Sequence, residues 1–313
     1  MRKQNRQAIA ILGSDLHEWH SPPVFRSNEP DWFAACKRPL DQVKLLQTKL
    51  GGVPFLISGD IFNLPYPEPE TINFLIENMP PDTIAIPGQH DLPFHELENI
   101  KKSGFRTLQL AGAISKFSSP YISGANIYEA PWGTDLDAID TSNASGIRIL
   151  LCHRYVWQGK ARHAKATPIS EIKKLEPILQ KFDVAVFGDN HQSFDTVVGN
   201  CKVVNVGAFM RLKLDEKENK PRVVVLWDDM ELETVYLDCS KDVYLEIETS
   251  QRNDDNEMEG TSSEFLKELE TLDSISLDFV ELARGEITRT RGNKDRWAKI
   301  LEEVFIEYKG EGK

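Results

Sequence analysis

Side chains that could bind a metal ion or transfer a proton follow five separate apolar runs in this sequence. An amide, an imidazole and a carboxylate stand together in Gln89-His90-Asp91, directly after a glycine and a short apolar run. Four other apolar runs end at residues of the same kinds, namely Asp15 with His17, Asp60, His153, and Asp189 with His191. One such residue at a strand end is usually a cap or a satisfied polar group. Five coincident strand ends favour a shared site.

The residue types in this set suit divalent metal ions. Apart from His90 and Asp91, they supply three carboxylates, three imidazoles and one amide carbonyl, with no thiolate. Oxygen and nitrogen ligands of this kind favour manganese, iron or zinc over calcium or copper. Because the set exceeds what one ion needs, we expect two ions that share Asp60. A pair of ions about 3.5–4 Å apart can hold a phosphoryl group and activate a water, which predicts hydrolysis of a phosphate ester.

Buried strands must position these side chains. The run at residues 8–12 is continuously apolar, as in a strand buried on both faces, and further strands are predicted at residues 53–57, 83–86, 147–152 and 183–187. Helical spacing of apolar residues occurs between them, at 41–50, 71–78 and 172–182. In α/β sheets, ligands gather at the carboxyl ends of strands. The pattern therefore predicts an α/β fold that brings the five strand ends together.

The chain changes character after His191. Close-set β runs without intervening helices lie at 194–198, 202–206, 222–227, 232–237 and 243–247, and an antiparallel sheet fits them. We expect a loop rich in proline and aromatic residues at 19–39. The domains predicted are a catalytic domain at 1–248, an acidic linker at 249–260 and a C-terminal helical segment at 261–313.

Composition narrows the class of protein. The net charge of −12 is unfavourable for binding nucleic acid, unless bound divalent cations offset it near the site. The four cysteines are far apart, which indicates free thiols in a reducing compartment. The sequence has neither a signal-peptide core nor an apolar run of roughly 20 residues that could cross a bilayer. We therefore expect a cytoplasmic protein that does not bind membranes.

The order and spacing of the strand-end motifs resemble those of the calcineurin-like metallophosphoesterases. That family carries D-x-H, G-D, G-N-H-D/E, a single H and G-H-x-H, and the matching positions here span about residues 8 to 240. The resemblance implies a two-sheet sandwich flanked by helices. The second motif, Gly59-Asp60-Ile61-Phe62, looks most like that of the DNA double-strand-break repair nucleases of the SbcCD type and their phage relatives.

The resemblance also implies a role for each site residue. Two metal ions, with manganese first and iron, zinc or magnesium as alternatives, would activate a hydroxide that attacks phosphorus. His90 would donate a proton to the leaving oxygen, and Asp91 would set its orientation. The first ion would be held by Asp15, His17, Asp60 and His191, and the second by Asp60, Gln89, His153 and Asp189.

Two residues depart from the family pattern. Gln89 stands where the family has Asn, so the amide carbonyl reaches one methylene further. Asp189 replaces the first His of G-H-x-H and brings the site to three carboxylates, which favours harder ions such as manganese or magnesium. A weakened second metal position is the alternative outcome. A His that usually follows the second motif in the repair nucleases is replaced by Asn63.

The segment after His153 indicates the substrate. It is basic and aromatic, and a phosphate backbone and stacked bases would suit it; its candidate contacts, with Asn63, are Arg154, Tyr155, Lys160 and Arg162. The leading hypothesis is a DNA exonuclease or endonuclease subunit in repair or recombination. The alternatives are a phosphatase or phosphodiesterase acting on a small molecule or nucleotide, and a non-catalytic scaffold with a degraded metal site.

The C-terminal segment suggests a protein partner. Its last helix has an apolar stripe that includes Trp297 and Phe305. Repair nucleases of this type dock such helices on the coiled-coil root of an ABC-type ATPase, so the resemblance implies that partner. Packing of the helix on its own domain and a homodimer are the alternatives.

Overall fold

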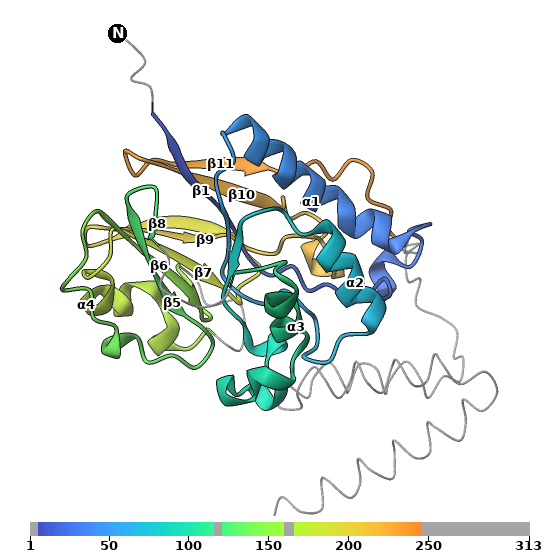
Figure 1. The fold of residues 1–313 in the computed structure, drawn as a ribbon, viewed down its shortest axis with the longest axis horizontal. Coiled ribbons are helices and arrows are strands. Elements are labelled where there is room, and N and C mark those ends of the chain that lie inside the picture. Colours follow the sequence, from blue (N-terminus) through green and yellow to red (C-terminus); the bar gives the residue numbers. More distant parts are fainter. Residues whose placement is uncertain (1–5, 116–120, 160–165, 246–313) are drawn as a thin grey trace, which may run out of the picture. The chain divides into compact units, whose positions relative to one another are not determined.

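The computed structural model describes residues 6–115, 121–159 and 166–245, all within one compact unit, Met1–Glu248. Two β-sheets and four α-helices make up this part of the chain (Figure 1). The α-helices are α1 (Trp32–Lys49), α2 (Pro69–Asn78), α3 (Gly104–Ala111) and α4 (Glu176–Leu179). Short 3₁₀ turns connect them at Val24–Arg26, Gln89–Asp91, Pro93–His95, Leu97–Lys102, Leu136–Ala138, Pro168–Ser170, Ile172–Leu175 and Leu214–Glu216. The predicted linker at 249–260 and helical segment at 261–313 lie outside the described residues.

The first sheet has the order β11-β10-β1-β2-β3. Its strands are β1 (Ala8–Gly13), β2 (Phe55–Ile57), β3 (Thr83–Ala85), β10 (Arg222–Trp227) and β11 (Leu232–Tyr236). Strands β1, β2 and β3 run parallel, and β10 pairs antiparallel with β1. The carboxyl ends of β1, β2 and β3 therefore share one edge.

The second sheet has the order β4-β5-β6-β7-β9-β8. Its strands are β4 (Tyr121–Ile122), β5 (Ala125–Ala130), β6 (Ile147–His153), β7 (Val184–Gly188), β8 (Phe194–Val198) and β9 (Cys201–Asn205). Strands β5, β6, β7 and β9 are parallel to one another. The two mixed sheets, flanked by helices, confirm the predicted α/β sandwich.

Side chains that alternate between the two faces of each strand form three apolar layers. Side chains of both sheets meet in the central layer, where Leu12 and Leu56 of the first sheet join Leu151 and Val186 of the second. Their neighbours along β6 and β7 point outward into a layer that α4 helps to cover. Helices α1, α2 and α3 cover the outer face of the first sheet. Because successive strand residues face opposite sides, burial of both faces explains why the run at residues 8–12 is continuously apolar.

The hairpins after His191 differ from the single antiparallel sheet that was predicted. Strands β8 and β9 do form an antiparallel pair, as do β10 and β11. The first hairpin joins the second sheet through β9, which is parallel to β7, whereas the second hairpin joins the first sheet. Residues 243–245 of the last predicted run are not a strand. Local β patterning identifies strands but does not say which sheet each strand completes.

The predicted loop at 19–39 is wrong from residue 32 onward. Helix α1 begins at Trp32, because the Asp31 side chain accepts a hydrogen bond from the Ala34 amide at 2.9 Å and caps the helix. The helix then runs through Pro39, a residue that usually interrupts helices because it lacks an N–H group. Pro39 is buried, so tertiary packing outweighs its local cost.

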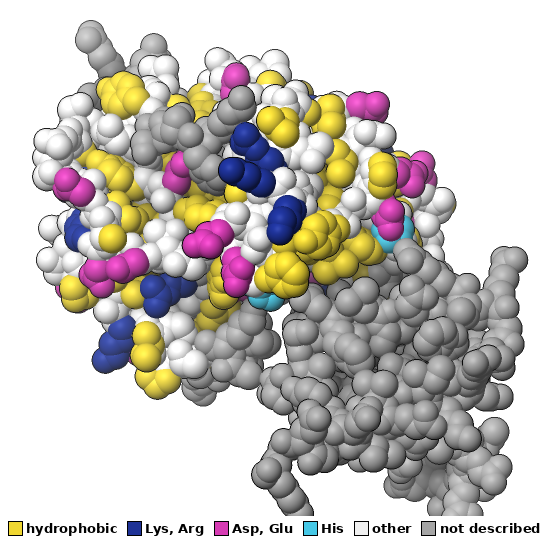
Figure 2. All heavy atoms as spheres, turned by 60° about the horizontal axis from the view of Figure 1, so that its bottom comes forward, with side chains coloured by type: hydrophobic (Ala, Val, Ile, Leu, Met, Phe, Trp, Pro, Cys, Tyr) yellow, Lys and Arg dark blue, Asp and Glu magenta, His cyan; other side chains and the backbone are white. Residues whose placement is uncertain are grey.

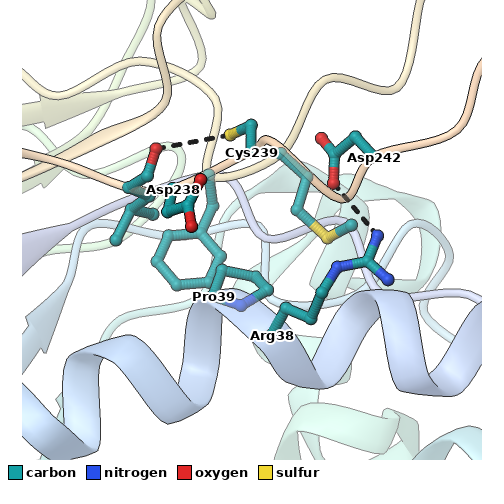
Figure 3. A pocket seen from close by; sticks show the side chains of 8 residues that line it. Arg38, Pro39, Asp238, Cys239 and Asp242 are labelled. Atoms are coloured by element: carbon teal, nitrogen blue, oxygen red, sulfur yellow. Dashed lines mark hydrogen bonds and ion pairs between the residues drawn. The ribbon is translucent and has the colours of Figure 1, made fainter.

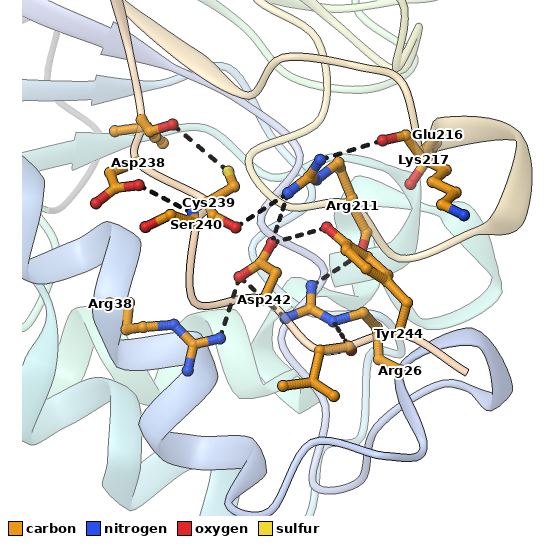
Figure 4. A network of polar contacts seen from close by, with 12 residues as sticks. Arg26, Arg38, Arg211, Glu216, Lys217, Asp238, Cys239, Ser240, Asp242 and Tyr244 are labelled. Atoms are coloured by element: carbon orange, nitrogen blue, oxygen red, sulfur yellow. Dashed lines mark hydrogen bonds and ion pairs between the residues drawn. The ribbon is translucent and has the colours of Figure 1, made fainter. Parts of the chain in front are cut away.

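The chain after β11 is fastened to the start of α1 by a group of ionic contacts that we call the arginine cluster (Figure 4). Its members are Arg26, Glu29, Arg38, Arg211, Asp242 and Tyr244. Asp242 contacts Arg26 and Arg38 at 3.1 Å and Arg211 at 3.3 Å. A small pocket adjoins the cluster, lined in part by Arg38, Pro39 and Cys239 (Figure 3). Among the described residues, no helix is long and apolar enough to cross a membrane.

Candidate metal centre

The carboxyl ends of strands from both sheets converge on one buried group of polar side chains. Asp15 and His17 follow β1, Asp60 follows β2, and Gln89 and His90 follow β3. His153 ends β6 and Asp189 follows β7. Backbone hydrogen bonds join the first two loops, from the Asp15 amide to Gly59 at 3.1 Å and from the His17 amide to Asp60 at 3.0 Å. The predicted convergence of the five strand ends is therefore present in the structure.

Four of these residues have left-handed backbone conformations. The φ angles of Asp15, His17, Asp60 and Asp189 are 52°, 50°, 51° and 77°. This region is unfavourable for residues other than glycine, at a cost of about 1–3 kcal/mol each, and such strain gathers at functional sites. The backbone turns sharply here, and the four side chains enter one site.

Glycines allow the loops to approach closely. Gly59 has a φ of +105°, and an added Cβ would overlap the His153 ring. An added Cβ on Gly88 would overlap the carboxylate of Asp60. A side chain at either position would displace the residues that converge on the site.

The first group of metal-type ligands consists of Asp15, His17 and His191. One ligand atom from each lies within 4.8 Å of the others. The Nε2 atoms of His17 and His191 are 3.1 Å apart, and His17 Nε2 is 3.9 Å from Asp15 Oδ1. Asp60 Oδ2 lies 3.8 Å from the same His17 nitrogen, so its carboxylate borders this group.

The second group consists of Asp15, Asp60 and His153, with the same 4.8 Å limit. His153 Nε2 lies 3.2 Å from Asp60 Oδ2, while Ser58 O lies 2.5 Å from Nδ1 of the same ring. Beside them, the Gln89 amide donates to Asp189 Oδ1 at 2.8 Å. Asp60 belongs to this group and to a third that contains His17 and His90, so it is well placed to be shared.

The donor atoms of these groups fit divalent metal ions. Gln89 Oε1 is buried and has no hydrogen-bond partner within the described part of the chain, although the NH₂ of the same amide is bonded. The nitrogen and oxygen atoms gathered around it are those that manganese, iron, zinc and magnesium accept. A buried acceptor without a donor is costly unless a cation or water satisfies it. The residues could therefore bind metal ions of this class.

Burial and close charges shift the pKa values of these groups in opposite directions. Burial alone would raise the pKa of Asp60, but the contacts with His153, His90 and His17 together outweigh it and hold the pKa below its usual range. Burial alone would lower the pKa of His153, yet Asp60, Asp15 and Asp189 together raise it to about 10. Burial keeps the pKa of His17 well below its usual value. His17 is consequently neutral, as a ligand must be, and a cation beside His153 would displace its proton.

His90 lies at the edge of the group and is oriented differently from the prediction. Its Nδ1 is 2.9 Å from the carbonyl oxygen of Asn63, and its ring lies edge-on to His17 with centroids 5.0 Å apart. The carboxylate of Asp91 instead accepts from the backbone amides of Ile61, Phe62 and Gly88, at 2.9–3.2 Å. Asp91 therefore fixes the loops, while a backbone carbonyl orients the imidazole.

The predicted substrate contacts are only partly described. Arg154 and Tyr155 are half-buried, and burial together with the charge of Asp189 raises the pKa of the Tyr155 hydroxyl. The next carbonyl, of Val156, accepts from the Asn190 amide at 2.8 Å, so this segment lies along the loop after β7. Lys160 and Arg162 fall outside the described residues.

One acidic contact of the site was missed by the sequence argument. Glu216, in the loop between β9 and β10, lies 2.6 Å from Nδ1 of His191. Neither motif spacing nor periodicity singles out this residue, because Glu216 lies 25 positions after His191, in the loop that follows β9.

Comparison with known proteins finds structural likeness at low sequence identity. The sequence matches no protein-family model and no curated protein. A solved structure described as a novel archaeal phosphodiesterase is 14% identical, with a TM-score of 0.40 over 73% of this chain and 99% of its own. A structure from Thermus thermophilus is 11% identical, with a TM-score of 0.44 over 74% of this chain and 100% of its own. Likeness at this level carries no inference about activity.

Proposed function

We propose that this protein is a metal-dependent phosphodiester hydrolase that acts on DNA. The observation that carries the proposal is the convergence of Asp15, His17, Asp60, His153 and His191, whose ligand atoms lie within 4.8 Å of one another in overlapping groups. Two divalent ions bound there would supply Lewis acidity toward phosphoryl oxygens and would lower the pKa of a water. Paired metals at such spacing suit displacement at phosphorus better than any chemistry of the isolated side chains.

The chain's own residues would hold the metals and move a proton. Asp60 would be shared by the two ions, with Gln89 and Asp189 on the side of His153. His90 would transfer a proton to the leaving oxygen from Nε2, because Nδ1 faces the Asn63 carbonyl and must carry a proton to bond with it. The Asn63 carbonyl thereby holds the ring in place.

The substrate assignment rests on the segment after β6. Tyr155 provides an aromatic ring whose hydroxyl interacts with Asp189, and the preceding Arg154 provides a cation, as a single strand or an unpaired end of DNA would require. On the face that Figure 2 shows, Lys and Arg side chains are interspersed with Asp and Glu. Attraction of the phosphate backbone would thus be local to the site rather than spread over that face.

A manganese-dependent cleavage assay tests this function. Single-stranded DNA, double-stranded DNA and a nitrophenyl phosphodiester are compared, with Asp60→Ala as the control that removes the shared ligand. We expect cleavage of DNA that declines steeply with salt and a loss of bound manganese in Asp60→Ala. Cleavage of the small diester alone would favour a small-molecule phosphodiesterase. A wild-type chain that takes up no divalent metal would leave only the scaffold hypothesis.

We also propose that residues 261–313 bind an ABC-type ATPase, on the basis of their apolar stripe. Co-purification with such an ATPase, lost when these residues are deleted, would support this partner. A deleted chain that keeps the partner would contradict it.

A further inference from the structure

Glu216 is a buried carboxylate in the loop that joins β9 to β10. It ends the 3₁₀ turn Leu214–Glu216 and is 4% exposed, whereas its neighbours Lys217 and Glu218 are exposed. A buried carboxylate without a hydrogen-bonding or charged partner is rare, because removing its charge from water is costly.

Both oxygens of Glu216 have defined partners. Oε2 accepts from the backbone amides of Leu212 and Lys213, at 2.8 and 3.1 Å. Oε1 lies 2.6 Å from Nδ1 of His191. Because the carboxylate is already held by two amides, its remaining oxygen is fixed in place and can only accept from the imidazole.

That contact determines which nitrogen of His191 carries the proton. A proton on Nδ1 donates to Glu216 and leaves the lone pair of the neutral ring on Nε2. Nε2 is the atom that faces the site, 3.1 Å from Nε2 of His17. Outer contacts of this kind fix the tautomer and orientation of metal-binding histidines.

The loop that carries Glu216 is itself anchored by the arginine cluster. Arg211 donates to the carbonyl of Lys217 at 3.1 Å, and its own carbonyl accepts from Arg26 at 3.1 Å (Figure 4). The carboxylate therefore projects from a loop tied at both ends, instead of from a free surface turn.

We infer that Glu216 is a positioning residue that holds His191 in the tautomer able to bind a metal ion through Nε2. The inference rests on the proposed metal site, but the tautomer itself is a property of the chain alone. Loss of this contact should weaken metal binding without removing any ligand.

Glu216→Gln tests the inference sharply, because glutamine has only one oxygen. When that oxygen keeps the amides of Leu212 and Lys213, the NH₂ group faces His191 and can only donate to Nδ1. The ring proton then moves to Nε2, the wrong nitrogen for binding. Glu218→Gln is the matched control, since it makes the same charge change two residues away on an exposed side chain.

Manganese affinity is measured by calorimetry on the full chain without substrate, and the melting temperature is measured without metal. We expect Glu216→Gln to bind manganese about 10–100-fold more weakly, while its melting temperature and all properties of Glu218→Gln stay at wild-type values. Wild-type affinity in Glu216→Gln would overturn the inference.

Nitrogen NMR of His191 in the metal-free protein at alkaline pH shows which ring nitrogen carries the proton. The wild-type measurement requires neither bound metal nor a folded variant. We expect the wild-type proton on Nδ1, and its transfer to Nε2 in Glu216→Gln. A wild-type proton on Nε2 would refute the positioning role even where metal binds. A proton on Nδ1 in a protein that binds no metal would instead refute the proposed function alone.

Discussion

Two buried polar groups of this protein, the candidate metal centre and the arginine cluster, differ in how their charges are matched. In the arginine cluster, every carboxylate faces a guanidinium, and Asp242 alone contacts Arg26, Arg38 and Arg211. In the metal centre, three carboxylates meet imidazoles, and Gln89 Oε1 keeps a lone pair without a donor among the described residues. The acids of the first group are neutralised by guanidinium groups, although Arg211 Nε has no hydrogen-bond partner among the described residues, whereas the second group leaves a buried acceptor that a cation could satisfy.

The backbone shows the same difference. Residues of the metal centre adopt left-handed conformations and pack against glycines that tolerate no side chain. The arginine cluster has no left-handed residue, as judged over the described chain, and joins the start of α1 to the segment after β11. Strain and unmatched acceptors occurring together are evidence of binding, whereas a matched and unstrained group is evidence of structural support.

Replacement of His90 should separate catalysis from metal binding within the metal centre. We expect His90→Ala to retain manganese but to lower kcat about 10²–10⁴-fold, because the proton donor is lost while the carboxylates remain. Calorimetry and the DNA cleavage assay measure the two effects. Turnover at the wild-type rate would show that another group provides the proton.

Replacement of Arg26 should have the opposite signature. Its side chain is fully buried, so Arg26→Met leaves Glu29 and Asp242 short of a cation and should lower the free energy of unfolding by about 3–5 kcal/mol. Manganese affinity of the folded protein should fall much less than in Glu216→Gln, because Arg26 contacts the loop of Glu216 only through the Arg211 carbonyl. Arg6→Met, which removes an exposed ion pair with Glu233, is the control and should cost less than about 1 kcal/mol. Equal losses of unfolding free energy in Arg26→Met and Arg6→Met, measured by urea denaturation, would show that the arginine cluster stabilises the protein no more than an exposed ion pair does.

The smallest expected effect is on the pH dependence of stability. It comes from Glu129, a carboxylate outside both the metal centre and the arginine cluster. Burial raises the pKa of Glu129, in β5, to about 7 from an ordinary value of 4.5. Since its folded pKa is the higher one, its contribution to stability is complete below pH 4.5 and is lost as the pH rises through 7. Glu129→Gln should remove a decline of the order of 1 kcal/mol over this window.

Urea denaturation at a series of pH values measures this decline. Glu77→Gln, on the exposed side of α2, provides the baseline. A pH dependence that is identical in Glu129→Gln and wild type would show that Glu129 is well solvated.

The sequence was sufficient to predict the parts of the site that depend on continuous strands. Residues 8–12 and 149–152 are apolar throughout because both faces of β1 and of this part of β6 are buried, so the polar residues that end them were conspicuous. Parallel pairing then places the ends of β1 and β2 at one edge of the first sheet, and the ends of β6 and β7 at one edge of the second. The ligand types followed directly from the residues found there.

The remaining features depend on contacts that local patterns do not encode. Glu216 reaches His191 through an irregular loop, and the group that orients His90 is a backbone carbonyl, which any residue at position 63 would provide. The path of α1 through Pro39 and the division of the late hairpins between two sheets were both settled by packing. Such outcomes require the partner surfaces to be known.

Asp60 follows a strand of the first sheet, and His153 ends a strand of the second. A metal ion bound by both residues would therefore cross-link the two sheets. The central apolar layer between the sheets would set the distance between these ligands. A cavity in that layer, as Leu56→Ala would create, should weaken metal binding although the cavity does not adjoin the ligands. The melting temperature should accordingly rise with the concentration of the ion, and the rise should be larger when both sheets bind the ion more tightly.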